Sequence, residues 1–185
     1  FKTATGREVE VTGPYGWKID QGYETAALIS MIQTTQSQPR EPQYAKTAAD
    51  RNCDWGNTYT EIDLSNQHVY MIKDGAVIWD APCVTGNVAR GNATPAGIYS
   101  LTYKETNRIL RGRKKADGTY TYASHVDYWM PFNGGIGLHD ADWRSKFGGT
   151  IYQNNGSHGC INLPPDKAKL LYGYVYPGMP VICYH

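Results

Sequence analysis

Hydrophobic and polar residues alternate along much of the chain after residue 54. Alternation over short segments is typical of strands that bury one face. It predicts strands at 59–64, 68–73 and 76–84, and the Asp-Gly pair at 74–75 predicts a hairpin turn between the last two. Later segments of the same kind predict four more strands, at 97–102, 124–130, 136–139 and 180–184.

Two segments follow a helical spacing instead. Asp20 is suited to cap a helix over about residues 21–36, in which four apolar residues form a stripe that predicts a packing face. Residues 165–172, with proline in the first turn and Gly173 behind them, predict a second helix. The stripe consists of Ala27, Leu28, Met31 and Ile32.

The strand-rich order divides the chain into two unequal parts. Residues 1–19 alternate over short stretches, and residues 36–44 contain Pro39 and Pro42 among polar residues, which predicts a linker. We therefore expect a small α+β amino-terminal piece over residues 1–50. Residues 51–185 are expected to form a mainly β domain, a sandwich with one late helix.

Composition excludes several classes of partner. The 185 residues are 41% hydrophobic and carry a formal net charge of +1, which argues against nucleic acid as the main partner. A basic cluster at 108–115 is interpreted as a solvated loop, with contact to an anionic polymer as the alternative. No apolar run reaches the roughly 20 residues that span a bilayer, so we expect no membrane contact by this chain.

The candidate chemistry lies in Ser157-His158-Gly159-Cys160-Ile161-Asn162, downstream of His139. A thiol becomes a strong nucleophile as thiolate, and a nearby histidine is the usual means of generating one. Glycines at 134, 135 and 137 precede His139, and Asn154-Asn155-Gly156 predicts a tight turn before the motif. Such glycines let the backbone pass close to a ligand. The pattern predicts a catalytic cysteine site.

Other interpretations of the same residue types remain open. Cys183, in an apolar run, is interpreted as a buried structural thiol, and His68 and His125 as ordinary residues. A zinc site is an alternative to the catalytic cysteine site, because residues of the types that bind zinc are present at four positions. No CxxC or HExxH cluster occurs, however. We expect neither metal nor cofactor. The four positions are His139, His158, Cys160 and Cys183.

Taken together, the motif and the upstream His139 resemble the signature of the L,D-transpeptidase (YkuD-type) catalytic domain. The resemblance covers roughly residues 54–184, in the family's order, and the combination is highly specific. The amino-terminal piece resembles, more weakly, the tail of a peptidoglycan-binding module. The further segments that agree are Tyr59–Leu64, Val84-Thr85-Gly86, Thr94-Pro95-Ala96-Gly97 and Gly178-Met179-Pro180-Val181.

The resemblance implies a peptidoglycan L,D-transpeptidase that forms 3→3 cross-links through a cysteine thioester and releases D-Ala. Cys160 would be the nucleophile, and His139 the base, oriented by the main chain of Asp140. His158 would shape the pocket, and the amides of Gly159 and Cys160 are candidates for an oxyanion hole. Carbapenem-type β-lactams, which acylate the family, would inhibit the enzyme.

Candidates for binding the stem peptide flank this catalytic group. Trp129, Met130 and Asn133 precede the His139 strand and are candidates for lining the donor pocket. Ser157 and Asn162 belong to the motif itself and are further candidates for substrate binding. Two alternatives remain: a cysteine carboxypeptidase or endopeptidase that uses water as acceptor, and a noncatalytic wall-binding module.

The implied substrate also implies a location. We expect a monomer that acts outside the cell, at the wall of a bacterium, in peptidoglycan biosynthesis, wall biogenesis and the maintenance of cell shape. The chain opens at Phe1, and we interpret it as part of an exported protein that is anchored by a segment absent here. Of Cys53, Cys83 and Cys183, at most one intramolecular disulfide is expected.

Overall fold

In a computed structural model, which describes all residues 1–185, the chain forms two compact units. One unit comprises residues 15–56, and the other combines residues 1–14 with residues 57–185. This division differs from the predicted boundary at residue 50, because the first fourteen residues pack with the strands that follow residue 57. The larger unit holds all the candidate catalytic residues.

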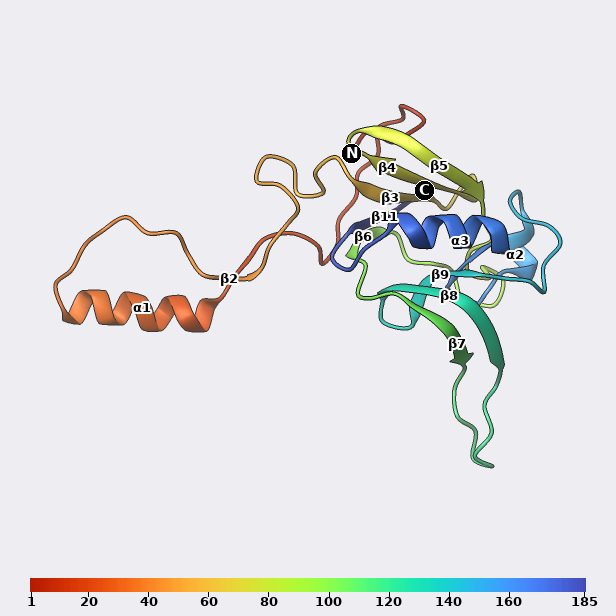
Figure 1. Cartoon of the computed structure of the whole chain (residues 1–185). Coiled ribbons are helices and arrows are strands. Elements are labelled where there is room, and N and C mark those ends of the chain that lie inside the picture. Colours follow the sequence, from red (N-terminus) through yellow and green to blue (C-terminus); the bar gives the residue numbers. More distant parts are fainter. The chain divides into compact units, whose positions relative to one another are not determined.

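A mixed five-stranded sheet forms one layer of the larger unit, in the order β5-β4-β3-β11-β6 (Figure 1). Strands β3 and β11 are parallel, and the other neighbours are antiparallel. All five strands were predicted from alternation. Their bounds are β3 Tyr59–Asp63, β4 His68–Lys73, β5 Ala76–Pro82, β6 Gly97–Ser100 and β11 Pro180–Tyr184.

A four-stranded sheet, in the order β10-β9-β8-β7, forms the second layer (Figure 1). Strands β8 and β9 were predicted, whereas β7 and β10 were not. The prediction of a loop at the basic cluster was wrong at Arg108 and Arg111, which lie on β7. The strand was missed because it is an exposed edge strand whose sequence shows no apolar alternation. The bounds are β7 Glu105–Arg111, β8 Ala123–Asn133, β9 Ile136–Asp140 and β10 Ile161–Leu163.

The hydrophobic core lies between the two sheets, so the predicted mainly β sandwich is confirmed. Strand residues such as Ile62 and Leu138 are fully buried there. The predicted late helix, α3 (Pro165–Tyr174), begins at a proline and buries Ala168 and Leu171. A second late helix, α2 (Ile151–Asn155), was not predicted, because five residues carry no helical period.

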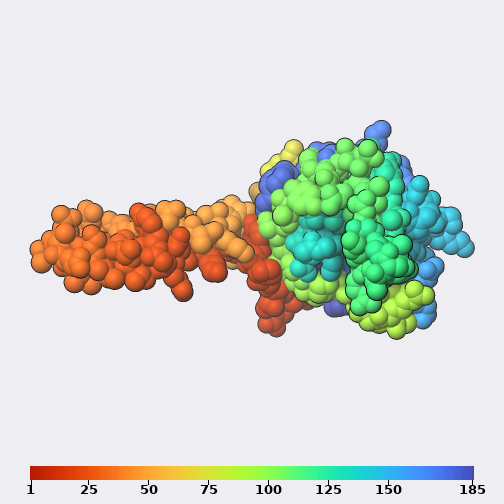
Figure 2. Space-filling view, turned by 90° about the horizontal axis from the view of Figure 1, so that it is seen from below, coloured from red at the N-terminus to blue at the C-terminus, as the bar shows by residue number.

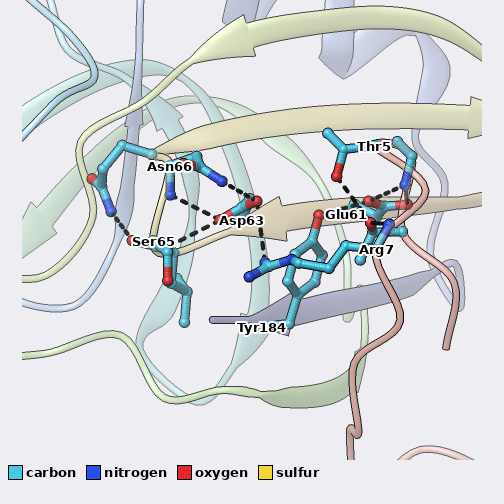
Figure 3. Close-up of polar contacts among 11 residues, drawn as sticks. Thr5, Arg7, Glu61, Asp63, Ser65, Asn66 and Tyr184 are labelled. Atoms are coloured by element: carbon cyan, nitrogen blue, oxygen red, sulfur yellow. Dashed lines mark hydrogen bonds and ion pairs between the residues drawn. The ribbon is translucent and has the colours of Figure 1, made fainter.

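The amino-terminal segment, residues 1–14, packs on the outer face of β3 and β11 (Figure 3). The Ala4 amide donates to both carboxylate oxygens of Glu61, at 2.9 and 3.0 Å, and the Tyr184 hydroxyl donates to the same carboxylate at 2.8 Å. Arg7 lies 3.5 Å from Asp63. Glu61 is fully buried, and burial raises its pKa, although the hydrogen bonds from Ala4 and Tyr184 oppose that rise. The segment thus satisfies carboxylates that would be costly to bury alone.

The smaller unit contains β1 (Lys18–Ile19), α1 (Gln21–Gln33) and β2 (Tyr44–Lys46). The Asp20 carboxylate accepts from the Tyr23 amide at 3.0 Å, which confirms the predicted cap. The predicted packing face was wrong: no residue of α1 is buried, and Leu28 and Ile32 are exposed, because so short a unit has little core. None of the helices has the length and apolar content of a membrane span.

Candidate active site

Parallel pairing of β9 with β10 brings the candidate base and the candidate nucleophile together. In the register, Ile161 lies opposite Leu138 and Asn162 opposite His139. Cys160 directly precedes Ile161 and therefore lies beside Gly137. The alternation of side chains along the strands puts it on the same face of the sheet as Asn162 and His139. The side chains of Cys160 and His139 line one cavity of about 180 Å³, and the histidine is only 3% exposed.

Hydrogen bonds within the motif fix the backbone that carries Cys160. The Ser157 hydroxyl donates to the Cys160 carbonyl at 2.6 Å and accepts from the Gly159 amide at 3.0 Å. Gly159 has φ of +121°, which side-chain-bearing residues rarely adopt, so glycine is required there. The Gly159 amide is therefore engaged, which argues against its predicted role in an oxyanion hole and leaves the Cys160 amide as the candidate.

A buried threonine holds this loop from the other side. The Thr94 hydroxyl donates to the Gly159 carbonyl at 2.7 Å and accepts from the Gly86 amide at 3.0 Å. A Cβ on Gly86 would lie 1.8 Å from the Asn92 carbonyl oxygen, so the approach excludes any side chain. The Ser157 amide donates to the Thr85 carbonyl at 2.9 Å. These bonds explain physically why Val84-Thr85-Gly86 and Thr94-Pro95 accompany the cysteine motif.

His139 is held in one orientation and one tautomer by the backbone. Its Nδ1 contacts the Asp140 carbonyl oxygen at 2.7 Å, and since a carbonyl only accepts, Nδ1 carries the proton and Nε2 remains an acceptor. The Asp140 carboxylate accepts instead from the amides of Asp127 and Tyr128, at 3.1 and 2.7 Å. The main-chain option for Asp140 is thus the one that the geometry favours. Burial lowers the pKa of His139, so the ring is neutral at pH 7.

The Cys160 thiol lies beside the glycines that precede and begin β9. Its thiol donates to the Gly135 carbonyl at 3.5 Å. Burial raises the pKa of the thiol to about 11, and a hydrogen bond from the Gly137 backbone opposes this rise. At neutral pH the site therefore holds a thiol and a neutral imidazole, an arrangement in which the base must take the proton as the nucleophile attacks.

Aromatic side chains form the walls around the thiol. His158 stacks on Tyr122, with ring centroids 4.5 Å apart and planes 19° apart, and both residues line the cavity of His139. A second cavity, of about 380 Å³, also reaches Cys160 and is lined by Trp129 and residues of the β7–β8 hairpin. In Figure 2 this hairpin, in green, covers part of the face that the view shows. The nucleophile is thus open to two cavities.

The remaining predicted substrate-binding residues divide into two groups. Ser157 and Asn162 line the cavity of His139, and the buried Oδ1 of Asn162 has no hydrogen-bond partner. The prediction that Met130 lines the donor pocket was wrong. Side chains alternate along β8, so Met130 lies on the other face from Trp129 and is fully buried in the core. Asn133 ends β8, half-buried, and lines neither cavity at Cys160.

Several residues that line the cavity of His139 were not predicted from the sequence, among them Trp143, Arg144 and Tyr122. Trp143 stands with its ring centroid 5.9 Å from that of His139, and Arg144 lines the same cavity. Both follow soon after the His139 strand, in a segment without apolar periodicity. An aromatic residue next to a cationic one in a loop beside the predicted base could have indicated that they belong to the site. Tyr122 had no such signal, because a long hairpin separates it from the motif in sequence.

The other cysteines lie apart from this chemistry. Cys83 and Cys183 are fully buried in the core, and burial raises the pKa of both thiols far above the ordinary value. All four cysteines are free. The structure contains no group of three or more His, Cys, Asp or Glu side chains arranged to hold a metal ion.

Comparisons with known proteins agree with this geometry. A family model described as the L,D-transpeptidase catalytic domain, YkuD, matches residues 57–183. L,D-transpeptidase 1 of Mycobacterium tuberculosis is 29% identical over 133 residues, which cover 68% of this chain and 50% of that protein. The chain thus spans about half the length of this curated relative.

Solved structures show the same fold. The crystal structure of a cysteine-to-serine mutant of Enterococcus faecium L,D-transpeptidase is 37% identical, covers 100% of this chain and 73% of that one, and has a TM-score of 0.79. The catalytic domain of E. faecium L,D-transpeptidase acylated by ertapenem, solved by NMR, is 43% identical, covers 69% of this chain and 97% of that one, and has a TM-score of 0.60. The chain belongs to the L,D-transpeptidase (YkuD) catalytic domain family.

Proposed function

We propose that the chain forms 3→3 cross-links in peptidoglycan through a thioester on Cys160. The observation that carries this proposal is the pairing of Cys160 with a neutral, backbone-oriented His139 at a cavity, within a chain of the L,D-transpeptidase family. The donor is a stem peptide whose third residue is a diamino acid and whose fourth is D-Ala.

In the first step the sulfur attacks the carbonyl carbon between the third and fourth residues. Nε2 of His139 accepts the thiol proton as the S–C bond forms, and the Cys160 amide is the candidate donor to the developing oxyanion. The C–N bond then breaks, and His139 returns the proton to the departing amine. The products are free D-Ala and an acyl-enzyme thioester.

In the second step the side-chain amine of a neighbouring stem peptide attacks the thioester carbonyl carbon, a C–N bond forms and the C–S bond breaks. The amine nitrogen must occupy the place that the D-Ala nitrogen left, because His139 now removes a proton from it and returns that proton to the Cys160 sulfur. The two cavities at Cys160 support this assignment: the cavity that contains His139 receives the leaving group and then the acceptor amine. The second cavity, beside Trp129, holds the acyl part of the donor.

The proposed substrate implies where the protein acts and which class of inhibitor acylates it. Peptidoglycan lies outside the bacterial membrane, so the proposed site of action is the cell wall. The similar E. faecium catalytic domain is described as acylated by ertapenem, which supports carbapenems as acylating inhibitors of Cys160 here.

Intact-mass analysis with a defined stem tetrapeptide tests this function. Wild-type protein should gain the mass of the tripeptidyl acyl group, release D-Ala and, with an acceptor amine present, yield a 3→3 dimer. Cys160→Ala should gain no mass from the tetrapeptide or from a carbapenem, and an adduct on this variant would refute the nucleophile. Free tripeptide as the main product would establish the hydrolase alternative. No acylation of wild-type protein by either compound would favour a noncatalytic wall-binding module.

A further inference from the structure

Arg144 is a half-buried cation in the cavity of His139 that has no acidic partner. One guanidinium nitrogen, an Nη, donates to the Asn155 carbonyl at 2.9 Å. The Nε atom is buried and has no hydrogen-bond partner, and no Asp or Glu forms an ion pair with the residue. Burial also lowers its pKa, which reflects the cost of desolvating an uncompensated charge. A buried N–H donor without a partner is rare in folded proteins and requires an explanation.

The charge of Arg144 acts on the catalytic pair. Burial lowers the pKa of His139 most, and the positive charge of Arg144 lowers it further. Both residues line the same cavity with Cys160 and Ser157, and in the turn after β9 the Arg144 backbone amide donates a hydrogen bond to the Ala141 carbonyl at 3.2 Å. The guanidinium, bound to the Asn155 carbonyl, therefore shares the cavity of the imidazole that handles the proton.

The chemistry at His139 defines what must lie beside that cation. The amine that leaves Cys160 takes its proton from His139, so it occupies this cavity, and in an amino acid a single carbon separates the amine from its carboxylate. We propose that Arg144 binds the free α-carboxylate of the departing D-Ala residue. A guanidinium offers a planar pair of donors that matches a carboxylate, and the pair would satisfy the open Nε. This inference rests on the proposed function.

The assignment makes Arg144 a specificity-determining residue. A donor whose fourth residue ends in a carboxylate forms the ion pair, whereas a donor amidated or extended at that position does not. Because the carboxylate is bound before and during the reaction, its loss lowers kcat/KM mainly through KM. A hydrogen-bonded charge of this kind accounts for a difference of roughly 10- to 100-fold.

Two synthetic donors test the proposal: a stem tetrapeptide ending in D-Ala, and the same peptide ending in D-Ala carboxamide. Acyl-enzyme formation and release of the amino acid or its amide are measured with wild type, Arg144→Gln and Arg144→Lys. Arg90→Gln is the matched control, since Arg90 is an exposed arginine whose side chain lines neither cavity at Cys160. Carbapenem acylation and thermal unfolding report whether each variant keeps a folded, reactive site.

Wild type and Arg90→Gln should prefer the acid over the carboxamide by roughly 10- to 100-fold in kcat/KM. Arg144→Gln should lose that preference through slower reaction of the acid alone, and Arg144→Lys should keep part of it through its charge. If a folded Arg144→Gln prefers the acid over the carboxamide as strongly as wild type does, the proposal is overturned. If Arg144→Gln does not fold, a wild type that reacts equally with the acid and the carboxamide overturns it. If wild type is acylated by the carbapenem but by neither peptide, the proposed function fails, and the role of Arg144 falls with it.

Discussion

Replacement of Thr94 by valine removes one hydroxyl that connects three segments of the catalytic unit. Thr94 is only 4% exposed, and its hydroxyl joins the Gly86 amide to the Gly159 carbonyl, directly before Cys160. Valine has nearly the same shape, so the change tests the two hydrogen bonds rather than the packing. Both backbone groups would remain buried without a partner.

The magnitude follows from those two groups. Each of the two buried groups left unpaired costs about 1–3 kcal/mol, so we expect Thr94→Val to lower the free energy of unfolding by about 2–6 kcal/mol. Because domains of this kind are stable by only about 5–15 kcal/mol, the loss is large. The released Gly159 carbonyl should also slow acylation of Cys160.

Urea denaturation followed by tryptophan fluorescence measures the stability, and the rate of carbapenem acylation measures the site. Thr106→Val is the matched control, since Thr106 is exposed on β7, and it should change the free energy of unfolding by less than about 0.5 kcal/mol. Thr94→Ser should retain both bonds and most of the acylation rate. A Thr94→Val protein that unfolds and acylates like wild type would refute the reasoning.

Three further predictions concern the proton, the loop and the amino-terminal segment. Burial lowers the pKa of His139 below its ordinary 6.5, and the neutral ring is the base. The acylation rate should therefore rise with pH through that lowered pKa and be level at pH 7. Acylation rates measured by stopped flow that fall between about pH 5 and 7 would contradict this. Gly159→Ala forces a residue with a side chain to adopt φ of +121°, so we expect the free energy of unfolding, measured by urea denaturation, to fall by about 1–3 kcal/mol and acylation to slow. Wild-type stability and a wild-type acylation rate would show that glycine is not required at this position. Tyr184→Phe removes the hydroxyl that donates to buried Glu61, and thermal or urea unfolding should report a loss of about 1–3 kcal/mol with unchanged carbapenem acylation; unchanged stability would mean that this bond contributes nothing net.

The sequence by itself determined the features that depend on local chemistry. Alternation identified the strands of the five-stranded sheet, and Asp20 and Pro165 identified the starts of two helices. The motif around Cys160, with His139 upstream, identified the candidate nucleophile and base, because a thiol beside imidazole among glycines has few structural explanations.

Only the tertiary structure decided which groups meet across the fold. β10 and α2 have only three and five residues, too few to show a period, and β7 is an exposed edge strand without apolar alternation. Met130 and Trp129 differ only in the face of β8 on which they lie, and a shift of one residue exchanges those faces.

The partners of the site were likewise set by long-range pairing. Strand register places His139 beside Asn162, the turn after β9 brings Arg144 into the same cavity, and Thr94 reaches Gly159 from a distant loop. The first and last of these contacts join residues far apart in sequence, and none of the three leaves a local periodicity. The amino-terminal segment packs on β3 because Glu61 is buried and needs donors, a need that becomes visible only when the sheet is assembled.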